Sequence, residues 1–179
     1  MAFSFPVRKE SDEVFFAATN PVNINHYDLE ELKRLAADNP RQRARICTHT
    51  SSSDLLHEMF IVHGQGAYVR PHRHLTRREG MQVLEGIADM VIFSEEGELC
   101  EVRRLDSVNF YQRLNAPFYH MLLIRSEWLV FHEATTGPFE RSDTEFAPWS
   151  PADSDDFAVC NFLDVIYKKV KSFSDRAVK

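Results

Sequence analysis

The sequence has few cysteines, no long hydrophobic run and no excess of positive charge. Its three cysteines, Cys47, Cys100 and Cys160, form neither a C-x-x-C pair nor a disulfide framework. We therefore expect a reducing, cytoplasmic compartment. Apolar runs such as Met121–Ile124 stop after four residues, far short of a membrane span. The N-terminus has no apolar segment typical of a signal peptide, so neither export nor membrane insertion is expected.

The charge balance points away from polyanionic partners. The chain has 21 lysines and arginines against 27 aspartates and glutamates, a formal net charge of −6. This balance argues against nucleic acids and anionic membranes as main partners. A length of 179 residues with 44% hydrophobic residues suits one globular domain with a substantial core. No repeat or linker divides it, so we expect a single domain spanning residues 1–179.

The stretch from Gly66 to Gly86 carries the pattern with the most chemical content. His72 and His74 are two residues apart, so in a strand they share one face, roughly 6.6–6.8 Å apart. Glu79 is an odd number of residues further on and joins them only if residues 75–78 turn or bulge. Two imidazoles and one carboxylate are ligand types that divalent transition metals take.

This spacing resembles the first sequence motif of the cupin superfamily: glycine, five residues, His-x-His, four residues, glutamate, six residues, glycine. Every fixed position matches. The second cupin motif usually ends Pro-x-Gly-x-x-His, where this chain has Asn115-Ala-Pro117-Phe-Tyr-His120. The resemblance implies the metal ligands His72, His74, Glu79 and His120. The turn before His120 must be built differently, because proline fixes φ at about −65° and glycine does not. The alternatives are surface histidines with a solvated Glu79, and a sheet-edge His120.

The hydrophobic pattern predicts two helices around a strand-rich centre. Asp28 with Glu31 suits the capping of a helix that ends before Pro40. From Arg45 onward, short Val-, Ile- and Phe-rich runs alternate with turns, which favours an all-β sandwich or barrel. Strands are expected near 14–16, 45–49, 55–62, 67–74, 81–85, 87–93, 99–105, 107–111, 118–124 and 127–134. Helical periodicity returns between Phe157 and Val170.

These elements agree with the cupin fold, a double-stranded β-helix or jelly roll, with an N-terminal and a C-terminal helix packed on it. We expect an N-terminal extension with its helix over residues 1–44, a β-barrel core over 45–134, and a C-terminal extension with its helix over 135–179.

A closer resemblance rests on three further segments: Arg43-Ala-Arg45-Ile-Cys-Thr-His49, Tyr68-Val-Arg-Pro-His-Arg-His74, and Phe146-Ala-Pro-Trp149-Ser-Pro151-Ala-Asp153. Over roughly residues 28–165 the chain resembles the WbuC family of cupin-fold metalloproteins. Members are associated with bacterial O-antigen and other polysaccharide gene clusters. The resemblance implies a fold and a metal site but no settled reaction. Asp153 stands where a glutamate is expected.

Strand parity suggests which other side chains face the metal. If Arg125-Ser126 is a two-residue hairpin turn, His120 faces Phe131. Glu133 then shares the face of His120, while His132 points away; a one-residue slip would reverse this. The catalytic residues are unknown, with Glu133, His57 and Tyr68 as candidates. Arg45 and His49 are candidates for binding an anionic substrate group such as phosphate or carboxylate.

Three functions fit these residues. The first is a metal-dependent enzyme, an isomerase or an oxygenase, acting on a sugar or sugar nucleotide in bacterial polysaccharide biosynthesis. The second is a non-catalytic metal-bound sensor or carbohydrate-binding module. The third is a metal-free sugar epimerase or ketoisomerase that uses a His–acid dyad. The metal would be a divalent ion such as Zn, Fe, Mn or Ni. The expected partner is a small molecule, and the fold suggests a homodimer by analogy.

Overall fold

The computed structural model of the protein describes residues 2–177. Its elements, in chain order, are β1 (Val7–Lys9), β2 (Val14–Ala17), α1 (His26–Ala37), β3 (Arg43–Cys47), β4 (Leu56–Gly64), β5 (His72–His74), β6 (Glu79–Glu85), β7 (Ala88–Phe93), β8 (Leu99–Leu105), β9 (Tyr111–Leu114), β10 (Tyr119–Ile124), β11 (Trp128–Thr136), the 3-10 turn η1 (Arg141–Asp143), β12 (Thr144–Phe146) and α2 (Asp156–Ala177).

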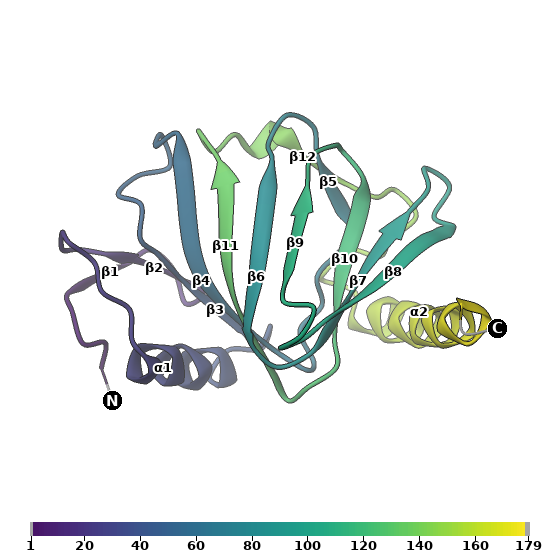
Figure 1. Ribbon diagram of the computed structural model, residues 1–179, viewed down its shortest axis with the longest axis horizontal. Helices are drawn as coiled ribbons and strands as arrows, with labels where there is room; N and C mark the ends of the chain where they lie inside the picture. The colour runs from purple at the N-terminus through teal and green to yellow at the C-terminus, as the bar shows by residue number, and fades with distance from the viewer. Residues whose placement is uncertain (1, 178–179) are drawn as a thin grey trace.

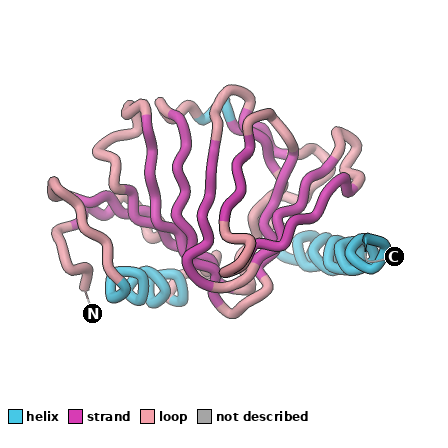
Figure 2. The backbone as a smooth tube through the Cα atoms, viewed as in Figure 1, coloured by secondary structure: helices cyan, strands magenta, loops and turns pink. Residues whose placement is uncertain are grey.

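The strands form two facing sheets, with a helix at each side of the molecule (Figures 1 and 2). One sheet has seven strands in the order β1-β2-β3-β4-β11-β6-β9, and the other has five in the order β12-β5-β10-β7-β8. Neighbouring strands are antiparallel except β2 and β3. This is the predicted jelly roll. Parts of both predicted extensions join the sheets, since β1 and β2 lengthen one and β12 the other.

Helix α1 covers the outer face of the seven-stranded sheet at β3 and β4 (Figure 1). Leu32 and Ala36 are fully buried against Ile46 and Val62. The predicted cap was three residues too late. Asn25 is the N-cap and accepts a hydrogen bond from the Tyr27 amide at 2.8 Å, while the Asp28 carboxylate accepts one from the Asn25 amide at 2.9 Å. Asp28 therefore completes the capping box from inside the helix.

Helix α2 covers the outer face of the five-stranded sheet. Ile166 and Val170 are buried against Val91, Met121 and Leu123. Because a helix covers this sheet from outside, both faces of β10 are covered and all six of its residues are buried, with His120 the one charged or titratable side chain on its inner face. No helix within residues 2–177 is both long and apolar enough to cross a membrane.

The hairpin predicted at residues 125–126 was wrong. β10 pairs with β5 and β7, whereas β11 pairs with β4 and β6, so the chain crosses between sheets at this point. The amides of Arg125 and Ser126 instead donate to the Ile87 carbonyl, at 2.8 and 3.3 Å. The predicted strand at 107–111 also begins later, because Asp106 accepts hydrogen bonds from the Val108 and Asn109 amides in a turn.

Gly86 ends β6 as the glycine motif requires. Its φ is +88°, and a Cβ atom there would lie 2.1 Å from the Trp128 carbonyl oxygen. Only glycine fits this turn without strain. The turn aligns β6 with β11, and this pairing brings Glu79 beside Thr135.

Candidate metal centre and its cavity

Three histidines meet at one end of the space between the sheets. His72 and His74 come from β5, and His120 on β10 pairs directly with His72. One ligand nitrogen from each lies within 4.8 Å of the others. Glu79, at the start of β6, completes the group: its two carboxylate oxygens lie 3.2 Å from His74 Nε2 and 2.9 Å from His120 Nε2. The four predicted ligands are therefore brought together.

The ring orientation of two histidines suits a metal. His72 Nδ1 lies 2.8 Å from the Arg70 carbonyl and His120 Nδ1 lies 2.9 Å from the Phe118 carbonyl. A carbonyl can only accept, so each ring carries a proton on Nδ1 when neutral and keeps a lone pair on Nε2. Backbone hydrogen bonds of this kind orient metal-binding imidazoles. The donor set therefore fits a divalent transition metal.

His74 is held differently. Its Nδ1 lies 2.9 Å from Arg77 Nη2 and 3.3 Å from Thr144 Oγ1. A guanidinium can only donate, so His74 Nδ1 accepts and the neutral ring carries its proton on Nε2, facing Glu79. Arg77 is fixed by an ion pair of 2.8 Å to Asp143. Ligation through His74 Nε2 therefore requires that proton to leave or to move to Nδ1, where Thr144 Oγ1 can accept it.

Burial and mutual contact shift the acid–base behaviour of the group. Burial lowers the pKa of His72 to about 3, and neighbouring His120 adds to the effect. Burial alone would raise the pKa of Glu79, but hydrogen bonds from His120 and His74 hold it well below its ordinary value. Burial likewise opposes charge on His120, yet the hydrogen bond to Glu79 prevails and raises the pKa of His120. The cluster therefore contains an ionised carboxylate that a cation can use.

A cavity of about 830 Å³ extends from this cluster across the inner face of the seven-stranded sheet. Cross-strand pairs share a face, so the lining residues form rows that run across the strands. One row contains Cys47, Met59, Glu133, Met81 and Gln112. The next contains His57, Thr135, Glu79 and Leu114. A polar path therefore leads from Glu79 through Thr135 to His57.

The cavity lining contains most of the buried polar atoms that lack a partner. Within residues 2–173, whose side chains are described, five such atoms occur, and four of them belong to residues that line the cavity. These four are His57 Nε2, His63 Nδ1, Gln112 Oε1 and Thr135 Oγ1. A buried polar atom without a hydrogen bond is unfavourable, commonly by about 1–3 kcal/mol. The cavity wall therefore holds most of the side-chain hydrogen-bonding capacity that the described part of the fold leaves unused.

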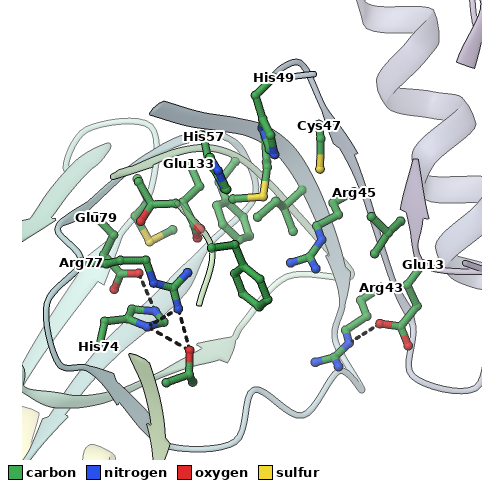
Figure 3. A pocket seen from close by; sticks show the side chains of 18 of the residues that line it. Glu13, Arg43, Arg45, Cys47, His49, His57, His74, Arg77, Glu79 and Glu133 are labelled. Carbon is green, nitrogen blue, oxygen red and sulfur yellow. Dashed lines mark hydrogen bonds and ion pairs between the residues drawn. The ribbon is translucent and has the colours of Figure 1, made fainter. Parts of the chain in front are cut away.

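Four of the five other predicted residues line this cavity. Glu133, His57, Arg45 and His49 all contribute to its wall, and Figure 3 shows Arg45 across the cavity from His74 and Glu79. His132 points away and packs on Phe60, as its parity required. Glu133 is thus on the side of His120 although the hairpin used to place it does not exist. Glu133 still faces the cavity because β11 pairs with β6, where Thr135 lies opposite Glu79 and Glu133 is two residues from Thr135 on the same face.

Tyr68 is not brought to the site. Its hydroxyl donates to the Pro151 carbonyl at 3.1 Å, and its ring packs against Phe162 of α2. The next residue, Val69, lines the cavity instead. Adjacent residues of an extended segment point to opposite sides, so Tyr68 faces the helix. Burial raises the pKa of Tyr68 to about 12.

Glu133 and His49 have distinct environments. Burial raises the pKa of Glu133 to about 7, and the charge of Glu79 adds to the effect. Glu133 can therefore exchange a proton near neutral pH. The His49 ring stacks on His57, with centroids 4.1 Å apart, and its Nδ1 accepts a hydrogen bond from the Glu58 amide at 3.2 Å. Burial lowers the pKa of His49. Neutral His49 is thus engaged with His57 and β4 rather than paired with Arg45.

Several cavity residues were not singled out from the sequence. Thr135 and His63 could have been found by parity, because they continue the faces of Glu133 and His57 at two-residue steps. Arg77 and Thr144 could not. Arg77 lies in a loop without periodicity, and Thr144 reaches His74 only because β12 pairs with β5.

Known proteins give the fold a name but no function. A family model described as a domain of unknown function (DUF6016) matches residues 24–105. No curated protein matches the chain. Among solved structures, CapF with the inhibitor 3-isopropenyl-tropolone aligns with a TM-score of 0.53 at 12% identity, over 61% of this chain and 32% of CapF. The capsular polysaccharide assembling protein CapF from Staphylococcus aureus gives 0.52 at 13% identity, over 60% and 32%.

The fold is a cupin fold. This chain spans about a third of the CapF chain, so the likeness is confined to one part of that protein. At such low identity it shows shared architecture alone. The cluster of His72, His74 and His120 stands on its own geometry.

Proposed function

We propose that this cupin is a metal-binding protein that binds, or acts on, a sugar or sugar nucleotide in bacterial polysaccharide biosynthesis. His72, His74, His120 and Glu79 hold the metal. The observation that carries the proposal is the coincidence of this donor set with the unpartnered polar atoms of one cavity. The polysaccharide context is supported by the WbuC resemblance and by the likeness in fold to CapF, a capsular polysaccharide assembling protein.

The residues of the cavity suit a polyhydroxylated ligand. Thr135 Oγ1, His57 Nε2 and Gln112 Oε1 offer both donors and acceptors from three strands. The methionines Met59 and Met81 flank Glu133 in its row and provide apolar contact for a ring face. A bound metal would supply Lewis acidity for a hydroxyl or carbonyl oxygen. Glu133 lies on the same wall as Glu79 and is placed to hold or move a proton on the ligand.

The first test is elemental analysis of protein purified without chelator, with His72→Ala and His132→Ala as a matched pair. Both variants remove one imidazole, but only His72 belongs to the cluster. We expect about one equivalent of metal per chain in the wild type and in His132→Ala, and almost none in His72→Ala. Equal metal content in all three proteins would contradict the ligand assignment. Absence of metal in the wild type after incubation with Zn, Fe, Mn and Ni would contradict metal binding.

Sugar binding needs a separate measurement. Calorimetric titration of metal-loaded wild type and Thr135→Val with a panel of sugar nucleotides should give saturable binding that weakens in the variant. Formation of product in the same mixtures would identify an enzyme, whereas binding without product would identify a sensor or carbohydrate-binding module. Failure of every sugar and sugar nucleotide to bind would contradict the proposed ligand class.

A metal-free epimerase or ketoisomerase is the second candidate, favoured by one contact. His120 Nε2 and a Glu79 oxygen are 2.9 Å apart, the geometry of a His–acid dyad. Because His120 Nδ1 faces the Phe118 carbonyl, the Glu79 carboxylate rather than the imidazole would exchange a proton with the sugar, without a metal. Turnover that persists after dialysis against a chelator and disappears in Glu79→Gln would favour it over the metal-dependent function.

We also propose a homodimer, by analogy of fold, and a reducing, cytoplasmic compartment.

The cysteines support the proposed compartment. All three are free thiols, and Cys47 is buried among cavity residues, where burial raises its pKa to about 11. Such a thiol is a poor nucleophile. Sedimentation velocity would test the dimer: a single species at the mass of one 20.8 kDa chain would contradict it.

A further inference from the structure

The arginines around the cavity differ in one respect. Arg8 pairs with Glu10, Arg43 pairs with Glu13 at 2.8 Å, and Arg77 pairs with Asp143 at 2.8 Å. Arg45 and Arg141 also line the cavity, and neither guanidinium makes a hydrogen bond or ion pair with the side chains described, residues 2–173. Arg141 lies on the exposed turn η1, whereas Arg45 lies on the inner face of β3. Figure 3 shows Arg45 directed from β3 into the cavity, beside the Arg43–Glu13 pair. Arg45 is thus a positive charge left without a counter-charge.

No acidic side chain of the cavity forms an ion pair with Arg45 among the described residues. Glu10 and Glu13 are engaged by Arg8 and Arg43, and Glu79 belongs to the histidine cluster. Glu133 remains; burial raises its pKa to about 7 against the opposing charge of Arg45, so this acid is only partly ionised at neutral pH and balances Arg45 only in part. The end of the cavity at Arg45 is therefore electropositive in a chain whose net charge is −6. An electropositive recess on an acidic protein favours an anionic ligand group at that point.

A second group at this end also lacks a partner. His63 on β4 pairs directly with Arg43 and lies diagonally opposite Arg45, whose own partner is Ile61. His63 is 8% exposed, and its Nδ1 has no hydrogen bond. The nitrogen is covered in the present ring orientation, and after a small rotation of the ring it can donate, as an imidazole N–H, to an oxygen that the Arg45 guanidinium also contacts. His63, and not His49 as expected from the sequence, is the histidine free to assist Arg45.

The two ends of the cavity are far apart. Glu79 lies on β6, three strand spacings from β3, and the row of Arg45 is four residues along the strands from the row of Glu79. With strands about 4.8 Å apart and a rise of about 3.3 Å per residue, the backbones are separated by roughly 20 Å within the sheet. A single small anion cannot contact both ends, so a ligand that uses both must be elongated.

We propose that Arg45, assisted by His63, forms an oxyanion subsite for the phosphate or carboxylate group of an elongated ligand. The neutral polar part of this ligand lies over Thr135 and His57 and extends to the histidine cluster. The inference rests on the proposed function for the cluster end only, because the oxyanion subsite requires no metal. A guanidinium binds both phosphate and carboxylate in a bidentate manner.

The test is calorimetric titration with inorganic diphosphate and, separately, with malonate, at constant ionic strength. The wild type is compared with Arg45→Gln and with Arg103→Gln, a matched change on the opposite sheet. Arg103 is exposed on β8 and outside the cavity, so the two variants change the net charge equally. We expect a loss of about tenfold or more in affinity in Arg45→Gln, a partial loss in Arg45→Lys and no change in Arg103→Gln.

The titrations distinguish the proposed oxyanion subsite at Arg45 from the proposed metal site at the histidine cluster. Diphosphate binding that survives in His72→Ala shows a subsite independent of the cluster, as proposed. Tighter binding of diphosphate than of malonate identifies a phosphorylated ligand, and the reverse order identifies a carboxylate. Equal loss in Arg45→Gln and Arg103→Gln would reduce the effect to bulk charge and overturn the subsite. No binding of either anion to the wild type at millimolar concentration would overturn it as well.

Discussion

The two ends of the cavity are organised in opposite ways. At the histidine end, a backbone carbonyl fixes His72 and another fixes His120, while Arg77 fixes His74. At the Arg45 end, the guanidinium has no fixed partner and the side chain is exposed. The first end is preorganised before any ligand arrives, and the second is not. Preorganisation reduces the entropic cost of binding, so the histidine end should dominate affinity.

The difference follows from where the two sites lie in the sheets. The histidine end is built where both sheets meet, from β5, β10 and β6, so its side chains lie between the layers, with His120 buried and the other three partly buried. The Arg45 end lies on one sheet, and the row of Arg45 continues through the apolar Ile61, Phe131 and Val83. An apolar row offers no acceptor to a guanidinium. Substitutions at the two ends should therefore differ in both size and sign.

The largest effect on stability is expected at Asp143, which supports the histidine end. Its carboxylate is 7% exposed and binds Arg77 and Thr76. In Asp143→Asn the Arg77 side chain, which is 10% exposed, loses its counter-charge, which should lower the free energy of unfolding by about 3 kcal/mol. Urea denaturation measures this. The control Asp12→Asn breaks an exposed pair with Lys9 and should leave the free energy of unfolding almost unchanged. Equal costs would show that burial does not distinguish the pairs.

The contribution of Asp143 to the stability of the fold should depend on pH. Burial would raise the pKa of Asp143, but hydrogen bonds from Thr76 and Arg77 lower it to about 2. A lowered carboxyl pKa stabilises the fold above the unfolded value of about 3.9, and the contribution is lost as pH falls toward 2. The stability difference between wild type and Asp143→Asn should therefore be constant from about pH 5 upward and shrink between about pH 4 and 2.

The next prediction concerns metal affinity and compares Glu79, a proposed ligand, with Glu133 on the adjacent strand. Glu79→Gln keeps the shape of the side chain but removes the charge that faces His74 and His120. Because loss of a residue that merely supports a metal ligand costs about 10–100-fold in affinity, loss of Glu79 should cost at least about 100-fold. Competition titration with a zinc-binding dye measures it. Glu133→Gln, on the adjacent strand, should change affinity by only a few-fold. A larger effect at Glu133 would exchange the two roles.

Local sequence patterns predicted most of the strands and the candidate metal ligands. They did not predict the side chains that hold these ligands in place. His72, His74 and Glu79 lie within eight residues of one another, and the match of this segment to the cupin motif predicted their meeting. β10 and β11 are close in sequence, yet they belong to different sheets, and pairing between sheets depends on the whole topology. Arg77, Asp143 and Thr144 become neighbours only when β12 pairs with β5. No local signal predicts a contact between residues that distant in the chain.

His63 should make the Arg45 end sensitive to pH. Burial lowers the pKa of His63 to about 4, and the charges of Arg45 and Arg41 add to the effect. The unfolded chain takes up this proton below about pH 6.5, while the folded protein does not until about pH 4, so stability falls in this window as pH decreases. Relative to pH 7, His63 should cost about 2 kcal/mol at pH 5. His63→Gln should lose this dependence; parallel pH profiles for both proteins would contradict it.

The smallest expected effect is a gain in stability, at Thr135. This residue lies on the cavity wall between Glu79 and His57. Its hydroxyl is buried without a partner, so Thr135→Val removes an unsatisfied group at nearly constant shape. The variant should be more stable by up to about 1 kcal/mol, yet bind its ligand less tightly. In the control Thr48→Val, the hydroxyl lost is one that donates to the Glu58 carbonyl at 3.1 Å, and stability should fall by about 1 kcal/mol. A gain in stability coupled to a loss of binding is expected where a polar group is kept for a ligand rather than for the fold. If thermal unfolding shows Thr135→Val destabilised like Thr48→Val, the hydroxyl serves the fold and this part of the cavity wall is not a binding surface.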